Sequence, residues 1–131
     1  MEIIRSIKSL DDFKLKLAQS DYESSYEGFE IVTDRQRILF GISNQNCCCE
    51  SWGHLSSEDN LDYFVGSALL GIKQTDEALK THDVLDEAGV IFVTFDTSKG
   101  PLQFAVYNAH NGYYGHAVRL VSEQLQIDDT V

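Results

Sequence analysis

The chain has 131 residues, which is the size of one compact domain. It contains 10 lysine and arginine residues and 21 aspartate and glutamate residues, which give a formal net charge of −11. Because a nucleic acid or an anionic membrane binds to a basic face, this balance argues against both classes of partner.

The sequence also argues against a membrane protein, a secreted protein and a disulfide scaffold. No segment approaches the roughly 18 consecutive apolar residues of a transmembrane helix. Charges at positions 2, 5 and 8 interrupt the start of the chain, where a signal peptide is apolar. Cys47, Cys48 and Cys49 are adjacent, and adjacent cysteines rarely pair with each other. We therefore expect a cytoplasmic single domain over residues 1–131, with a core at about 28–121 and a mobile tail at 122–131.

The first predicted element is a helix over residues 10–19. Ser9 precedes it as a typical N-cap, and an acidic residue, Asp12, follows three positions later. Leu10, Phe13 and Leu17 then recur at helical spacing and form one apolar stripe. We expect this helix to cover one face of a sheet.

The rest of the chain is rich in strand and turn signals. Apolar runs predict strands at residues 28–33, 37–43, 68–75, 90–96, 102–109 and 113–121. Gly71 predicts a bulge, the run at 90–96 is apolar on both faces and is expected to be central, and Asn111–Gly112 predicts a hairpin turn. Residues 44–60 are expected to form a long polar loop, followed by a helical turn at 61–65. The predicted fold class is α+β, an antiparallel β-sheet of five to six strands with one N-terminal helix.

The cysteine run and the four histidines are the first candidates for chemistry. The cysteines of a zinc site are usually separated by about two to four residues. Three consecutive cysteines, as at Cys47, Cys48 and Cys49, are expected to present their side chains in different directions and so cannot all bind one ion without strain. We therefore expect neither a metal nor a cofactor, and we interpret the cysteines as small apolar packing residues. A cysteine nucleophile activated by a histidine is the alternative.

A denser group of amide and aromatic side chains surrounds the predicted hairpin near the C-terminus. It contains Asn108, Asn111, Tyr113, Tyr114 and His116. Tyrosine offers a flat apolar face with a polar tip, and asparagine offers both a donor and an acceptor, a combination that suits a nucleobase and a ribose. The same residues also suit the half-buried end of an ordinary sheet, and the sequence leaves both interpretations open.

Two arginines and a tryptophan complete the set of candidates. Arg119 interrupts an apolar run, so it is either an inward-facing clamp for an anion or an outward-facing solvated residue. Arg37 flanks a predicted hairpin turn, where the solvated interpretation is favoured. Trp52 lies in the long polar loop, where it covers either a ligand or the core.

Two segments together resemble a family of small phage and prophage proteins. They are residues 44–51, NQNCCCES, and residues 111–118, NGYYGHAV. The acidic step Glu58–Asp59 and the turn at 61–67 fit the same pattern, and the resemblance covers roughly residues 28–121. The extra cysteine and Trp52 depart from it. Proteins that look like this include the phage Thoeris anti-defence sponges of the first-described type.

The resemblance implies a binding protein and not an enzyme. Such sponges bind the cyclic ADP-ribose isomers that a bacterial TIR-domain enzyme makes after infection, and some also bind cyclic oligonucleotides. They assemble as homodimers or larger homo-oligomers with ligand pockets between subunits. The expected function is therefore to bind and sequester a signal of the glycocyclic ADP-ribose type without cleaving it, in the cytoplasm of an infected bacterium.

The expected ligand contacts follow from the residue types in the matching segments. The candidates are Phe95, Tyr113, Tyr114 and Trp52 for base stacking, Asn108 and Asn111 for ribose or adenine edges, Arg119 and Arg37 for the pyrophosphate, and His116 beside them. Two alternatives stay open. One is an acidic inhibitor that binds a host protein directly, and the other is a hydrolase of a nucleotide signal that uses Cys49 or His116.

Overall fold

The computed structural model describes residues 1–16, 23–44, 52–57, 60–75, 89–108, 117–123 and 125–130. The strands are β1 (Glu2–Lys16), β2 (Glu23–Thr33), β3 (Arg37–Ser43), β4 (Trp52–Ser56), β5 (Ala68–Thr75), β6 (Gly89–Thr97), β7 (Gly100–Asn108), β8 (Ala117–Val121) and β9 (Ile127–Thr130). These strands form one sheet in the order β4-β7-β6-β5-β1-β2-β3-β8-β9, with antiparallel pairing throughout.

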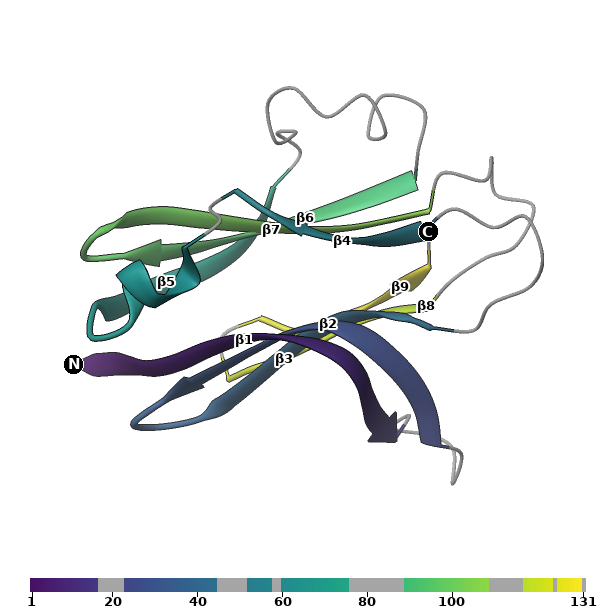
Figure 1. Ribbon diagram of the computed structural model, residues 1–131, viewed down its shortest axis with the longest axis horizontal. Coiled ribbons are helices and arrows are strands. Elements are labelled where there is room, and N and C mark those ends of the chain that lie inside the picture. Colours follow the sequence, from purple (N-terminus) through teal and green to yellow (C-terminus); the bar gives the residue numbers. More distant parts are fainter. Residues whose placement is uncertain are drawn as a thin grey trace.

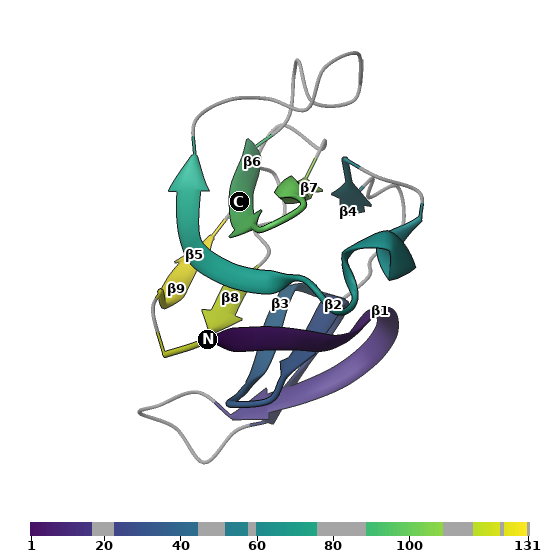
Figure 2. The ribbon, with the colours of Figure 1, turned by 90° about the vertical axis from the view of Figure 1, so that its left-hand side faces the viewer.

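The sheet folds on itself into two facing layers (Figures 1 and 2). One layer contains β4, β7, β6 and β5, and the other contains β1, β2, β3, β8 and β9. The layers are connected where β1 pairs with β5, through Glu2 opposite Leu69 and Ile3 opposite Ala68. Because this connection is short, the two layers are held together mainly by the side chains that pack between them.

Aromatic rings form the centre of the core between the layers. Phe29 of β2 and Phe104 of β7 lie 4.3 Å apart between ring centroids. Phe95 of β6 contacts Phe104 edge to face at 5.3 Å. Aliphatic residues surround these rings, among them Ile31, Ile38, Ile42, Val93, Leu102, Val118 and Leu120. The contact between Phe29 and Phe104 therefore joins one layer directly to the other.

Most of the strands expected from apolar patterning are present. The runs at 28–33 and 37–43 lie in β2 and β3, which form the predicted hairpin, and the helical turn at 61–65 is the 3₁₀ helix η1 (Leu61–Phe64). The run at 90–96 lies in β6, which has neighbours on both sides and is buried on both faces. The register shift between Leu69 and Gly71 confirms the predicted bulge in β5. The apolar residues on both faces of this run therefore predicted correctly that the strand lies inside the sheet and not at its edge.

The α+β class and the N-terminal helix at 10–19 are wrong. Residues 10–16 belong to β1, and the described residues contain no α-helix. In β1 the register shifts between Leu10 and Phe13, which pair with Gly28 and Tyr26, so three steps on β1 match two on β2. A β-bulge of this kind adds one residue and places positions three apart on the same face, which imitates helical spacing.

The shift between Ile4 and Ser6 acts in the same way, because Ile4 and Ile7 are both buried in the core. At the second shift, between Leu10 and Phe13, long-range pairing with β2 overrides the helix signal of residues 10–19. None of the helices among the described residues is long and apolar enough to cross a membrane.

Three further parts of the predicted topology differ from the structure. The described residues form nine strands instead of five to six, since the expected loop at 44–60 contains β4, residues 2–16 form β1 and residues 127–130 form β9. The strands β7 and β8 do not form the predicted hairpin, because β7 pairs with β4 and β6 whereas β8 pairs with β3 and β9. The segment 122–131, for which no strand was predicted, contains β9 with its buried Ile127. Val118 and Leu120 of β8 bury their side chains in the core from the layer that faces β7. For this reason β8 does not pair with β7, the strand that precedes it in the sequence.

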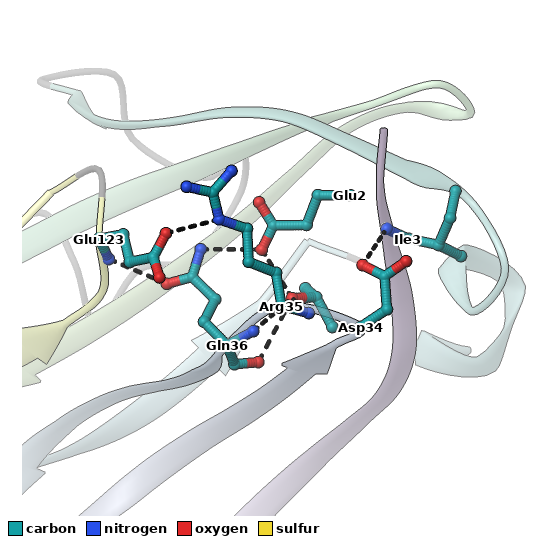
Figure 3. A network of polar contacts seen from close by, with 7 residues as sticks. Glu2, Ile3, Asp34, Arg35, Gln36 and Glu123 are labelled. Carbon is teal, nitrogen blue, oxygen red and sulfur yellow. Dashed lines mark hydrogen bonds and ion pairs between the residues drawn. The ribbon is translucent and has the colours of Figure 1, made fainter.

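A network of polar contacts connects the β2–β3 turn to β1 and to the segment between β8 and β9 (Figure 3). The side chain of Glu2 accepts hydrogen bonds from Thr33 Oγ1 at 2.6 Å and from Gln36 Nε2 at 2.8 Å. The backbone N–H of Glu123 donates to Gln36 Oε1 at 2.9 Å, and the Glu123 carboxylate lies 2.8 Å from Nε of Arg35. Through these contacts one turn holds β1 and the segment between β8 and β9 in place.

Candidate functional site

The outer face of the β1–β2–β3–β8–β9 layer carries a row of residues in register across all five strands. The row consists of Leu10, Gly28, Gly41, Arg119 and Asp128, each directly opposite the next on a neighbouring strand. Directly opposite residues project from the same face of a sheet. The row therefore places an arginine between a position without a side chain and a carboxylate. We call Gly41, Arg119 and Asp128 the Arg119 site.

Aromatic side chains cover the outer face of the sheet at Gly41. An added Cβ at Gly41 would lie 2.6 Å from Cζ of Phe13 and 2.6 Å from the carbonyl oxygen of Glu27. The Phe13 ring therefore occupies the space above Gly41, although β1 is two strands away. Phe13 reaches this position because β1 and β2 bend strongly beyond the bulge (Figure 1), and its ring stacks on that of Tyr26 at 5.9 Å with an interplanar angle of 27°.

Arg119 is buried to an unusual degree for an arginine on the outer face of a sheet. Its side chain is 12 % exposed, and its Nη1 lies 3.5 Å from Oδ2 of Asp128, whose side chain is 73 % exposed. Its Nε and Nη1 are buried and have no hydrogen-bond partner within the described ranges of the chain. The distance of 3.5 Å to Asp128 is too long for a strong charge-assisted hydrogen bond, so the ion pair only partly compensates the charge.

This arrangement favours an anionic ligand. A guanidinium group remains charged at all physiological pH values and can only donate hydrogen bonds. Leaving such donors buried and unpaired costs about 1–3 kcal/mol, and more for a charged group. A phosphate or carboxylate that accepts hydrogen bonds at Arg119 removes this cost and fits the planar geometry of the group.

Adding a methyl group at Gly41 tests whether the glycine beside Arg119 is required by packing. We expect Gly41→Ala to lower the free energy of unfolding by about 1–3 kcal/mol, because the new Cβ would lie 2.6 Å from the backbone oxygen of Glu27 and 2.6 Å from the Phe13 ring. Gly71→Ala is the matched control, since a Cβ there meets no atom within 4 Å, and its effect should stay within about 0.5 kcal/mol. Urea denaturation of both variants measures the difference, and equal midpoints would contradict the close packing.

The other described candidates lie apart from Arg119. Arg37 is on the same outer face, but its Nε lies 2.6 Å from Oε2 of Glu30, so it already has an anionic partner. Phe95 is completely buried in the core against Phe104. Asn108 is also buried, on the inner face of β7 next to the core residues Phe104 and Val106. The structure therefore does not bring Arg119, Phe95 and Asn108 into one site.

The remaining candidates fall outside the described residues. These are Asn111, Tyr113, Tyr114 and His116, together with Cys47, Cys48 and Cys49. Trp52 begins β4, and the described part of the chain does not include its side chain. Over the ranges that the structure describes, no group of three or more His, Cys, Asp or Glu side chains is placed to hold a metal ion.

Sequence reasoning missed the surroundings of Arg119. Gly28 begins one predicted strand and Gly41 interrupts the next, and a glycine inside a strand is typical of a close approach by another group. That signal was present in the sequence. The position of Asp128 could not be inferred, because it depends on the pairing of β8 with β9.

Comparison with known proteins yields one match. The model of a family described as "Domain of unknown function (DUF7448)" matches residues 3–120. This span runs from the beginning of β1 nearly to the end of β8, and it includes Arg119. No curated protein and no solved structure matches the chain.

Proposed function

We propose, for a chain that belongs to the DUF7448 family, that it binds a small anionic nucleotide signal at Arg119 and holds it without cleaving it. The ligand class is a cyclic ADP-ribose isomer of the glycocyclic type, as the sequence resemblance to phage Thoeris anti-defence sponges implies. Binding would keep the signal from the effector of the bacterial defence system. The protein would act stoichiometrically, in the cytoplasm of an infected bacterium.

One observation carries this proposal: the buried guanidinium of Arg119 has donor atoms without a hydrogen-bond partner among the described residues. The chain has a net charge of −11, so an anion is repelled by most of its surface. Binding an anion therefore requires a local cation whose charge is not already neutralised. Arg119 fits this description better than Arg37, whose charge is paired with Glu30.

The energetics are compatible with a stoichiometric trap. A ligand with roughly 35 non-hydrogen atoms that gains about 0.3 kcal/mol per atom binds with about −10 kcal/mol. This free energy corresponds to a dissociation constant in the tens of nanomolar. Retention of the signal in this way requires no nucleophile, general base or metal.

Calorimetric titration of the purified protein with cyclic ADP-ribose and its glycocyclic isomers tests the proposal. We expect saturable binding of one isomer, and heating the complex should release that ligand with its mass unchanged. A ligand that returns cleaved, or a protein that binds none of the isomers, would contradict sequestration. In the second case a host protein that is captured from lysate and released by salt would support the alternative of an acidic inhibitor.

The exposed carboxylate beside Arg119 provides a second test. Asp128→Asn removes the charge that competes with an anionic ligand for Arg119, so we expect the affinity to rise by up to about fivefold, as an exposed ion pair is worth at most about 1 kcal/mol. Asp129→Asn is the control, because it removes an equal charge from the next residue of β9, whose side chain projects from the opposite face. Weaker binding by Asp128→Asn would show that this carboxylate contacts the ligand favourably.

The proposal also concerns the oligomeric state of the protein. The resemblance implies a homodimer or a larger homo-oligomer with ligand pockets between subunits, and we propose the same state for this chain. In such an assembly a partner subunit would lie over the outer face that carries Arg119 and complete the enclosure of the ligand.

A further inference from the structure

A second cluster of reactive side chains lies between the two layers, where β4 lies over β1 and β2 (Figures 1 and 2). Ser9 of β1, Glu27 of β2 and His54 of β4 each contribute one side chain. Nε2 of His54 lies 3.0 Å from Oγ of Ser9, and Nδ1 of the same ring lies 3.1 Å from Oε1 of Glu27. The imidazole therefore bridges a hydroxyl and a carboxylate through its two nitrogen atoms.

The register places all three side chains on the inner face. Ser9 is directly opposite Phe29, and His54 is directly opposite Val106, and both of these partners belong to the core. Glu27 precedes Phe29 by two residues on β2 and therefore projects from the same face. The His54 ring also contacts the Phe29 ring edge to face at 5.0 Å. This cluster is thus separated from the Arg119 site by the thickness of the sheet.

For a neutral His54 ring beside an ionised Glu27, the chemistry of the three groups assigns a direction to both hydrogen bonds. An ionised carboxylate can only accept, so Nδ1 of His54 carries a proton and donates it to Glu27. In the neutral ring Nε2 then has a free lone pair, and the hydroxyl of Ser9 donates to it. A hydroxyl that donates to an imidazole, held in this tautomer by a carboxylate, is the arrangement that activates a serine as a nucleophile.

The exposure of the three side chains fits a reaction at Ser9. The Ser9 side chain is exposed, so a substrate can reach its oxygen. The side chains of His54 and Glu27 are only 16 % and 22 % exposed, which shields their hydrogen bond from competing water. Burial raises the pKa of the nearby Tyr107 hydroxyl above its usual value of 10.0, and the negative charge of Glu27 raises it further.

We propose that Ser9, His54 and Glu27 form a hydrolytic triad that cleaves carboxylic esters. Oγ of Ser9 attacks the ester carbonyl carbon while Nε2 of His54 takes the hydroxyl proton. The C–O bond to the alcohol then breaks, and His54 returns this proton to the departing alkoxide, which leaves an acyl group on Ser9. Water then attacks the carbonyl carbon of the acyl-serine while one of its protons passes to Nε2. The bond from this carbon to Oγ of Ser9 breaks, which releases the carboxylic acid, and His54 returns the proton to Oγ. Glu27 holds the ring and balances its positive charge in both steps.

This activity does not depend on the proposed sequestration, because the two sites use different residues on opposite faces of the sheet. No motif within one short segment of the sequence could have revealed the triad. Ser9 and His54 are 45 residues apart in the sequence, and His54 and Glu27 are 27 apart. Only the folding of the sheet into two layers brings β4 over β1 and β2.

The test uses the full chain after its cysteines have been alkylated, so that thiols do not react with the probes. Incubation with a fluorophosphonate should attach one phosphonyl group, and peptide mapping should place it on Ser9. The same protein should release p-nitrophenolate from p-nitrophenyl acetate. Ser9→Ala should abolish the adduct, and it should lower the rate of release by about 100-fold or more, the range expected for loss of a nucleophile assisted by a general base.

Two variants separate a catalytic role from a structural one. Glu27→Gln keeps the shape of the side chain but no longer fixes the ring as an anion does, so labelling should slow by about tenfold or more while circular dichroism stays unchanged. Ser6→Ala is the control, because Ser6 pairs with Val32 on the outer face of the layer and should label at the full rate. The proposal is overturned if Ser9 carries no adduct, or if Ser9→Ala releases p-nitrophenolate at the rate of the unmodified sequence.

Discussion

Arg119→Ala is expected to weaken binding of the cyclic ADP-ribose ligand by about 30-fold or more. The expectation follows from the two buried nitrogen atoms of Arg119 that lack a hydrogen-bond partner in the described part of the chain. Hydrogen bonds to a charged group contribute about 2 kcal/mol, which corresponds to this factor in the dissociation constant. Calorimetric titration of the variant with the isomer that the unmodified protein binds measures the change directly.

Two further variants show whether the loss comes from the ligand contact. Arg37→Ala removes an arginine from the same outer face, but this arginine is 59 % exposed and paired with Glu30, so the affinity should change by less than about threefold. Arg119→Met keeps an unbranched apolar side chain but removes the guanidinium group and its charge. It should lose binding while the melting temperature of the free protein is maintained or raised, because burying an incompletely paired charge costs stability. Full affinity in Arg119→Met would place the anion elsewhere.

Phe104→Ala is expected to lower the free energy of unfolding by about 3–5 kcal/mol, the usual cost of removing a buried phenylalanine ring. Phe104 is completely buried and contacts Phe29 in the facing layer and Phe95 in its own layer. Since the described strands of the two layers are connected through the short β1–β5 pairing alone, the loss of this contact removes packing that holds the layers together. Urea denaturation followed by tryptophan fluorescence measures the change.

Leu70→Ala is the matched control for this prediction. Leu70 is 67 % exposed on β5, so its truncation should change the free energy of unfolding by no more than about 0.5 kcal/mol. The two variants should have similar denaturant slopes if both unfold in one transition. If Phe104→Ala were as stable as Leu70→Ala, the aromatic cluster would not be the main contact between the layers.

The two proposed sites lie on opposite faces of the same layer. The Arg119 site is on the outer face of β3, β8 and β9, whereas Ser9 and Glu27 project from the inner face of β1 and β2. Successive residues of a strand project from opposite faces, so one layer can carry both sets of side chains. A variant that affects one site through direct contact should therefore leave the other unchanged.

Local patterning was sufficient for strands such as β3 and β6, whose apolar residues follow a strand pattern. Ile38, Phe40 and Ile42 alternate along β3 and all three are buried, as a period of two predicts. The run at 90–96 indicated a strand with apolar faces on both sides, and β6 has this environment. These predictions succeeded because the burial of a strand depends mainly on its own sequence of apolar residues.

Local patterning failed where pairing between distant strands changed the spacing of apolar residues. Leu10 and Phe13 share a face of β1 because a bulge adds a residue between them, and the sequence alone presents this as a helical stripe. The predicted β7–β8 hairpin failed for a related reason. Its turn signal was local, whereas the layer that β8 joins depends on where Val118 and Leu120 can be buried.

The sequence by itself determined the segments that form β2, β3, β5, β6, β7 and β8, the acidic charge and the short list of cations that could bind an anion. Only the tertiary structure decided that Arg119 is buried beside Gly41 and Asp128, because these residues come from three strands whose pairing is not encoded locally. It also decided that Ser9, Glu27 and His54 meet, since β4 reaches β1 and β2 only when the sheet folds over. A side-chain period is a property of one segment, whereas a site built across strands depends on register and on the packing of one layer against the other.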